Sequence, residues 1–483
     1  MHFHLTPPVN RRNAQSMFRR LENENSREKD VKGLKKEKEE INRKSGRWQI
    51  YRGTLCIALL ISCMTFVGLG ILSIYEQIPR NIKLKVGEEQ VFDMGLPVAG
   101  EIQKIEKGTE EAVAAGGRNS SNIPADSIHI DLSNTVTMRA EELNSYRMDL
   151  KLFGVIPFKQ VNIEVIQNKL VTPVGLPVGI YLKTDGILVV GVGDFLSLGG
   201  QNVSPSRYLL KSGDYILAVD GEEVWDKARF MQLIEECNGY PVVLKIRRDG
   251  EEFEVEIQPV QNQSGSYKLG IWVRDSAQGV GTLTFVDSEG NFGALGHGIN
   301  DVDTSIVMDI KSGTLYGTEI IAIKRGKRGE PGEMTGMIEY TDQNILGVIY
   351  GNTTQGVFGT CNETMLSGIE GEAIPIGLKQ EVEIGPAQIL CAVDGEPKYY
   401  DIEIKECHLD HSNVNRGIVL QVTDPDLIAV TGGIIQGMSG APIIQNSKLV
   451  GAVTHVLVND STSGYGIFIE EMLETENVYS ANL

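Results

Sequence analysis

The chain contains little cysteine, with six in 483 residues. Two of them, Cys56 and Cys63, lie in an apolar run, and the others are scattered: Cys237, Cys361, Cys391 and Cys407. Such scattered cysteines lack the close spacing of a disulfide framework. Cys407, His408 and His411 have the local spacing of metal ligands, but no second group of ligands accompanies them. We therefore predict a fold that does not depend on disulfides, and no metal or other cofactor.

Basic residues are outnumbered, with 45 Lys and Arg against 64 Asp and Glu, a net charge of −19. The charge is divided unevenly along the chain. Residues 1–52 contain 14 basic and 7 acidic side chains, a net of +7, which leaves −26 for residues 53–483. Because an acidic surface repels phosphates, the main body is not expected to bind nucleic acid.

Long apolar runs are also lacking, apart from residues 53–75, which are 23 residues without a charge. This length spans a bilayer as a helix. Arg47 and Arg52 belong to a basic flank on its N-terminal side, and Glu76 follows its end. The positive-inside rule then predicts a cytoplasmic tail over 1–52 and an acidic body across the membrane. A cleavable signal peptide is the alternative, and the long N-terminal region disfavours it.

Two segments follow the predicted span. Within residues 76–160, the stretch 108–122 is rich in Ala, Gly, Asn and Ser, and we expect it to be an exposed, protease-sensitive loop. Residues 161–262 read as strands around one helix over 227–237, with the hairpin signal Asp249-Gly250. They resemble a PDZ domain of bacterial envelope proteases, through Ser212-Gly213-Asp214-Tyr215-Ile216 and Asp220-Gly221.

A PDZ domain binds an extended chain as an added strand. The resemblance assigns peptide binding to a loop that begins at Val178 and comprises Gly179, Ile180, Tyr181 and Leu182.

Residues 270–483 are a series of short strands separated by Gly and Asn or Asp turns, which is typical of a sandwich or barrel. Within them, Gly437-Met438-Ser439-Gly440 has the form of a nucleophile turn, and the amides of Gly437 and Ser439 are positioned to form an oxyanion hole. The chain has seven histidines, and His297 lies between Gly296 and Gly298 after an apolar strand. We expect Ser439 to be a nucleophile and His297 its general base.

The acid that would orient the histidine is not fixed by spacing. Asp301 and Asp303 follow His297 closely, whereas Asp424 and Asp426 precede the serine. Each of these carboxylates could accept a hydrogen bond from the imidazole.

The order of apolar span, PDZ domain, Gly-His-Gly and Gly-Met-Ser-Gly-Ala-Pro over residues 53–483 is similar to the SpoIVB peptidase family of endospore-forming bacteria. The resemblance implies a mainly β fold, with a chymotrypsin-like double β-barrel peptidase after the PDZ domain and the transmembrane helix. It also implies a serine endopeptidase whose catalytic residues are His297, Asp424 and Ser439.

The resemblance also implies a biological role. Such a protein is anchored in the inner forespore membrane, with its catalytic domain between the two forespore membranes, and frees itself by self-cleavage. It then cuts a regulatory subunit of an intramembrane metalloprotease complex, which triggers processing of a late mother-cell sigma factor precursor.

Three other functions remain open from the sequence. The chain could be a catalytically silent PDZ scaffold or a general envelope quality-control serine protease. It could also be a cysteine peptidase that uses Cys361 or Cys407, although neither has flanking glycines to expose it.

Overall fold

A computed structural model describes residues 48, 51–92, 94–105, 128–409 and 413–480. The predicted tail and the stretch 108–122 lie almost entirely outside the described residues. Helix Tyr51–Gln77 has 27 residues and is long and apolar enough to cross a membrane. It contains the whole of the predicted span. The chain divides into two compact units, 1–75 and 76–483, and each is described by itself.

The second unit begins with a small sheet of strand order β1-β7-β6-β3-β4. Its strands are β1 (Asn81–Lys85), β3 (Val98–Lys104), β4 (Ile128–Asp131), β6 (Ser145–Leu152) and β7 (Ile156–Ile166). β1 lies parallel to β7, and the remaining neighbours are antiparallel. A separate pair joins β2 (Glu89–Phe92) to β5 (Val136–Arg139). Alternate residues of β6 and β7 are buried, as expected for a sheet with one face on a core.

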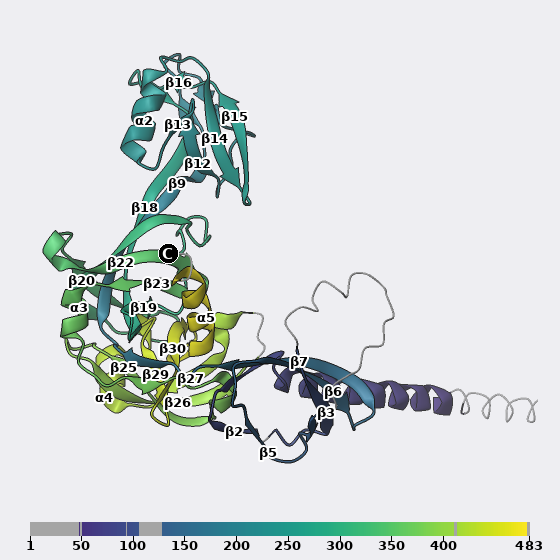
Figure 1. The fold of residues 1–483 in the computed structure, drawn as a ribbon. Coiled ribbons are helices and arrows are strands. Elements are labelled where there is room, and N and C mark those ends of the chain that lie inside the picture. Colours follow the sequence, from purple (N-terminus) through teal and green to yellow (C-terminus); the bar gives the residue numbers. More distant parts are fainter. Residues whose placement is uncertain (1–47, 49–50, 93, 106–127, 410–412, 481–483) are drawn as a thin grey trace, which may run out of the picture. The chain divides into compact units, whose positions relative to one another are not determined.

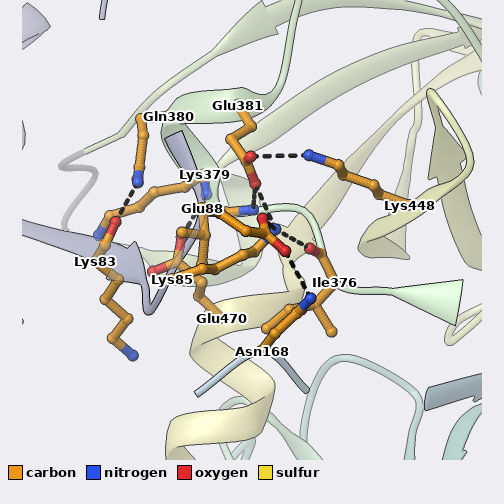
Figure 2. Close-up of polar contacts among 11 residues, drawn as sticks. Lys83, Lys85, Glu88, Asn168, Ile376, Lys379, Gln380, Glu381, Lys448 and Glu470 are labelled. Atoms are coloured by element: carbon orange, nitrogen blue, oxygen red, sulfur yellow. Dashed lines mark hydrogen bonds and ion pairs between the residues drawn. The ribbon is translucent and has the colours of Figure 1, made fainter. Parts of the chain in front are cut away.

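A buried lysine links this sheet to the segment that contains Ile376 and Glu381 (Figure 2). The side chain of Lys85 is 0% exposed, and its Nζ lies 2.7 Å from the carbonyl oxygen of Ile376 and 3.0 Å from a carboxylate oxygen of Glu381. Glu381 also accepts from Lys448, at 2.9 Å, and from the backbone N–H of Leu378, at 2.7 Å. A buried charge with this many partners is tolerated, because its lost hydration is replaced.

Six strands form a first closed ring, because each pairs with the next and the last pairs back with the first. In ring order they are β9 (Pro177–Val192), β18 (Ile271–Asp287), β19 (Asn291–Ala294), β23 (Gly356–Cys361), β22 (Ile345–Thr353) and β20 (Ile310–Lys324). Buried apolar side chains such as Leu283, Phe292 and Ile349 fill its interior. Figure 1 labels these strands.

The PDZ domain is built into this ring. β9 and β18 run beyond the ring, and their far halves join the PDZ sheet in the order β15-β14-β12-β9-β18. Gly186, at φ +98°, marks the bend in β9 between its two halves. The other PDZ elements are β10 (Phe195–Leu196), β11 (Asn202–Val203), β12 (Tyr215–Val219), β13 (Glu222–Glu223), α2 (Lys227–Glu236), β14 (Val242–Arg248), β15 (Glu251–Ile257), β16 (Val260–Gln261) and β17 (Tyr267–Lys268).

This arrangement corrects the predicted domain boundary. Residues 177–184, which we assigned to the PDZ domain of 161–262, are a strand of the first ring. The apolar pattern of β9 is continuous, so the sequence does not reveal that its two halves belong to different domains.

A second ring is a closed barrel of strand order β25-β26-β27-β31-β30-β29. Its strands are β25 (Gly385–Cys391), β26 (Lys398–Cys407), β27 (Ile418–Val422), β29 (Pro442–Gln445), β30 (Lys448–Leu457) and β31 (Asp460–Phe468). The predicted mainly β fold, with a PDZ domain and a double β-barrel, is confirmed.

The remaining elements connect or cover these two rings. They are β8 (Leu170–Pro173), β21 (Gly332–Ile338), α3 (Glu363–Gly368), β24 (Ile374–Pro375), α4 (Pro425–Thr431), β28 (Ile435–Gln436), α5 (Ile469–Ser480) and the 3-10 turns Asp342–Asn344, Lys379–Glu381 and Val414–Arg416.

Candidate active site

Ser439 lies in the turn between β28 and β29, where the backbone requires glycine on both sides. Gly437 has φ +99° and Gly440 has φ +97°, values that side chains with a Cβ rarely adopt. A Cβ on Gly440 would also lie 2.0 Å from the carbonyl oxygen of Thr282. The predicted glycine requirement of this turn therefore has two causes, backbone conformation and close contact with β18.

The serine turn is fixed by Thr282 and Thr454. The N–H of Thr282 donates to the carbonyl oxygen of Ser439, at 2.9 Å, and its hydroxyl donates to that of Gly437, at 2.8 Å. The hydroxyl of Ser439 donates to the carbonyl oxygen of Thr454, at 2.7 Å. No turn or loop hydrogen bond among the described residues uses the N–H of Gly437 or Ser439. Both amides thus remain available, and their oxyanion role stays a prediction.

His297 follows β19 on an unusual stretch of backbone. Leu295, at φ +69°, and Gly296, at φ +66°, are both left-handed, which is uncommon for a leucine. A Cβ on Gly298 would lie 2.5 Å from the carbonyl oxygen of Thr353. The Gly-His-Gly motif therefore reflects a tight turn packed against β22.

The tautomer of His297 follows from its hydrogen bond. Nδ1 lies 2.8 Å from the carbonyl oxygen of Gly298. Because a carbonyl oxygen can only accept, Nδ1 carries the proton, and Nε2 holds the lone pair that a general base needs. Burial lowers the pKa of His297, and the bond to Gly298 raises it in part. The imidazole is therefore neutral at neutral pH and able to accept a proton.

Backbone and side-chain contacts tie the histidine turn to the serine turn. The carbonyl oxygen of Thr282, whose N–H holds Ser439, accepts from the N–H of Leu295 at 3.2 Å. The side-chain amide of Asn415 donates to the carbonyl oxygen of Gly296 at 2.5 Å. The hydroxyl of Thr454 donates to the backbone oxygen of Asn415 at 2.7 Å.

Four of the residues that build this site were missed from the sequence: Thr282, Asn415, Thr454 and His455. Thr282, Asn415 and Thr454 act through backbone groups as well as side chains, and no local sequence motif surrounds them. His455 is the exception, since a histidine 16 residues after the serine (455 − 439) is a visible signal.

The predicted acid does not occupy the expected place. Asp424 caps α4, where one carboxylate oxygen accepts from the N–H groups of Asp426 (2.9 Å) and Leu427 (3.0 Å). Its other oxygen accepts from the N–H of Asp401 at 3.3 Å. No carboxylate among the described residues contributes to the pKa shift of His297. These contacts correct the prediction, because they make Asp424 a helix cap.

The other acid candidates near His297 are also occupied. Asp301 is fully buried, bonds to Arg274, and accepts from the N–H groups of Asp303 (3.0 Å) and Thr304 (2.9 Å). Asp303 contacts the same arginine at 3.0 Å. Both carboxylates therefore shape the loop after the histidine.

The cysteine alternative is not supported. Burial is the main cause that raises the thiol pKa of Cys361 to about 12 and that of Cys407 to about 11. Both thiols are protonated at neutral pH and are therefore poor nucleophiles. Within the described part of the chain, no three metal-binding side chains converge, and His411 lies outside that part.

The predicted PDZ peptide loop is wrong. Gly179, Ile180, Tyr181 and Leu182 lie inside β9, paired with β18 on one edge and β20 on the other. Their backbone is therefore committed to the first ring. The motif reasoning failed because a peptide loop was assigned by position before the PDZ strands, whereas this PDZ fold is completed by a later strand.

A cavity of about 340 Å³ lies instead between α2 and the start of β18. Apolar side chains line it, including Phe230, Met231, Ile234 and Ile271. In the described sheet, β18 is paired only with β9 over residues 271–274. The loop before it contains Gly270, at φ +75°. An open strand edge beside an apolar groove has the features of a site for an extended peptide.

The region that contains both turns matches a known protein family. Residues 265–473 match the family described as SpoIVB peptidase S55. Among curated proteins, the chain is 34% identical over 106 residues to the membrane metalloprotease ARASP, chloroplastic, of Arabidopsis thaliana, covering 21% of this chain and 22% of that protein. It is 32% identical over 69 residues to the putative zinc metalloprotease CPE1693 of Clostridium perfringens, covering 14% and 21%. The chain thus spans about a fifth of the length of each curated relative.

Two solved structures are also similar to parts of the chain. The PDZ domain of an SdrC-like protein from Listeria monocytogenes has a TM-score of 0.16 and 22% identity, covering 18% of this chain and 87% of that one. The Rv3671c protease from M. tuberculosis, active form, has a TM-score of 0.24 and 12% identity, covering 42% and 74%. Residues 265–473, which hold both His297 and Ser439, match the SpoIVB peptidase S55 family, and this match supports a serine endopeptidase.

Proposed function

We propose that the chain is a membrane-anchored signalling protease of sporulation. In this proposal it cleaves itself and then a regulatory subunit of an intramembrane metalloprotease complex, in the space between the two forespore membranes. The observation that carries the proposal is that the turn of Ser439 and the turn of a neutral His297 both bond to Thr282. The apolar helix Tyr51–Gln77 supports anchoring.

The proposed reaction uses these groups in order. The hydroxyl of Ser439 leaves the carbonyl of Thr454, and Nε2 of His297 takes its proton as the oxygen attacks the scissile carbonyl carbon. The N–H groups of Gly437 and Ser439 stabilise the resulting oxyanion. His297 then passes the proton to the leaving amine. Water attacks the acyl-enzyme while His297 takes a proton from it, and His297 returns this proton to the oxygen of Ser439 as the acid product leaves. The carbonyl oxygen of Gly298 holds Nδ1–H throughout.

The groove between α2 and β18 is proposed to hold an extended segment of the substrate or of the chain itself. Met231 projects from α2 and is 50% exposed. Replacing it with Glu puts a charge at the apolar groove and should weaken peptide binding there. A matched control is Tyr240→Glu, an exposed position outside the cavity lining. Equal processing rates in both variants would speak against the groove as a substrate site.

The enzymatic proposal is tested with the full chain in detergent micelles. Wild type, Ser439→Ala and His297→Ala are incubated with a fluorophosphonate probe, and self-cleavage is followed in parallel. Loss of the nucleophile in such a unit lowers turnover by about 10⁶, so Ser439→Ala should show neither labelling nor self-cleavage. Self-cleavage that survives in this variant overturns the serine mechanism, and a wild type that stays unlabelled favours a silent scaffold.

The substrate proposal needs a separate test. The full chain is co-expressed with the regulatory subunit of the intramembrane metalloprotease, and the cut products are mapped by mass spectrometry. A small number of defined cuts that vanish in Ser439→Ala supports a signalling protease. Broad degradation of unfolded casein, with the regulatory subunit left intact, would instead favour the quality-control function.

A further inference from the structure

Among the described residues, no carboxylate is hydrogen-bonded to the proposed general base, His297. Nδ1 of His297 bonds to the carbonyl oxygen of Gly298, which is the next residue in the chain and carries no charge. One hydrogen bond restrains one corner of the ring but leaves the ring free to tilt about it. A second contact is therefore needed to fix the plane of the imidazole, and with it the direction of Nε2.

The ring of His455 supplies that contact. It comes from β30 in the second barrel, and its centroid lies 4.9 Å from that of His297, with 33° between the ring planes. This distance is in the range of favourable aromatic pairs. His455 is exposed, whereas His297 is only partly exposed.

The backbone beside His455 is part of the catalytic site. The preceding residue, Thr454, accepts the hydroxyl of Ser439 through its carbonyl oxygen at 2.7 Å. The hydroxyl of Thr454 bonds to Asn415, whose side chain holds the backbone of Gly296. The nucleophile, the base and the ring over the base are therefore connected by one set of contacts.

The charge around His455 favours a neutral ring. His297 lies against it, Tyr465 is its cross-strand neighbour on β31, and Arg416 lies over the ring of Tyr465 at 5.1 Å. Partial burial, followed by His297 and Arg416, lowers the pKa of His455 to about 4. A neutral ring adds no repulsion when the base becomes imidazolium during the reaction.

We propose that His455 is a positioning residue. Its neutral, flat ring packs against the imidazole of His297 and takes no part in proton transfer. This inference rests on the proposed serine mechanism and adds to it a second contact that restrains the base. It also predicts which chemical property of His455 matters, because packing against His297 requires a flat ring and does not require ring nitrogens.

The test measures the second-order rate of fluorophosphonate labelling of the full chain in detergent between pH 5 and pH 9. The variants are His455→Phe, His455→Ala and, as a matched control, His129→Ala, an exposed histidine on β4. His455→Phe should label within about threefold of the wild type. His455→Ala should label about tenfold more slowly, the scale of a lost aromatic pair plus misorientation.

The pH profile separates positioning from a merely structural effect. In His455→Ala, water reaches the ring of His297, so the acid limb of the profile should move upward toward 6.5. His455→Phe and His129→Ala should keep the wild-type limb. A Phe variant as slow as the Ala variant overturns the proposal, because ring nitrogens would then be required. A slow Ala variant with an unmoved acid limb also overturns it. If the wild type and all variants are unlabelled, the serine mechanism itself fails, which is a distinguishable result.

Discussion

Replacement of Lys85 by Met should loosen the N-terminal sheet from the peptidase region without altering the shape of the buried side chain greatly. Lys85 is fully buried, so its removal takes a positive charge from Glu381 and a donor from the carbonyl of Ile376. Breaking a buried ion pair by removing one partner costs about 3–5 kcal/mol. Glu381 keeps Lys448 and the N–H of Leu378, which favours the lower end of that range.

The assay is hydrogen exchange of the full chain, followed by mass spectrometry on peptides that cover β1 and β7. A local loss of about 3 kcal/mol corresponds to exchange about a hundredfold faster in these strands. Peptides from the closed barrel strands β27 and β31 should be unaffected. Global unfolding is not used, because a chain with several domains does not unfold in one step.

Two further variants test the cause of this effect. Lys448→Met removes a partner of Glu381 that is 32% exposed, and should accelerate exchange by about fivefold or less. The double variant Lys85→Met with Glu381→Gln removes both buried charges and should recover most of the loss. If Lys85→Met leaves the exchange of β1 unchanged, or if the double variant shows the sum of two separate losses, the buried pair does not hold the sheet.

Three shorter predictions concern the site. Because burial lowers the pKa of His297 below 6.5, more than half of the base is unprotonated at pH 6.5, so the acid limb of the Ser439 labelling profile should have its midpoint below 6.5. A midpoint above 7 would contradict this. Asp424→Ala should lower the stability of the protein by about 1 kcal/mol, because α4 loses its cap, while the rate of Ser439 labelling stays within about threefold of the wild type. A thousandfold slower labelling would restore Asp424 as the catalytic acid. Arg274→Ala leaves the buried Asp301 uncompensated and should slow labelling, whereas the same change in an Asp301→Asn background should add little; equal losses in both backgrounds would deny the coupling.

The sequence predicts the chemistry of this protein better than its architecture. Ser439 and His297 are visible because the turns that hold them need glycine at fixed neighbouring positions. The groups that orient them are contributed by backbone amides and carbonyls of distant strands, and these have no residue signature. Asp424 illustrates the limit, since a carboxylate at a helix N-cap and a carboxylate behind a catalytic histidine look the same in a sequence.

Domain boundaries were obscured by strand length. β9 has 16 residues and β18 has 17, and each serves two domains. Their apolar patterns predict strands correctly but contain nothing about partners more than 80 residues away, such as Val178 opposite Gly281. The PDZ groove was misplaced for this reason, because its open edge belongs to a strand that the sequence assigns to the peptidase.

The pairing of β1 with β7 affects how cleavage is interpreted. Strands β1, β2 and β3 precede residue 106, and their partners β7, β5 and β6 follow residue 127. A single peptide bond cut between residues 105 and 128 would therefore yield two polypeptides that stay together through four strand pairings (β1–β7, β2–β5, β3–β6 and β3–β4) and the buried Lys85. The apolar helix is continuous with the first polypeptide, so the nicked enzyme would stay where its helix is. A denaturing gel would show such a molecule as two cleaved polypeptides, whereas fractionation without denaturant would find both polypeptides together with the apolar helix.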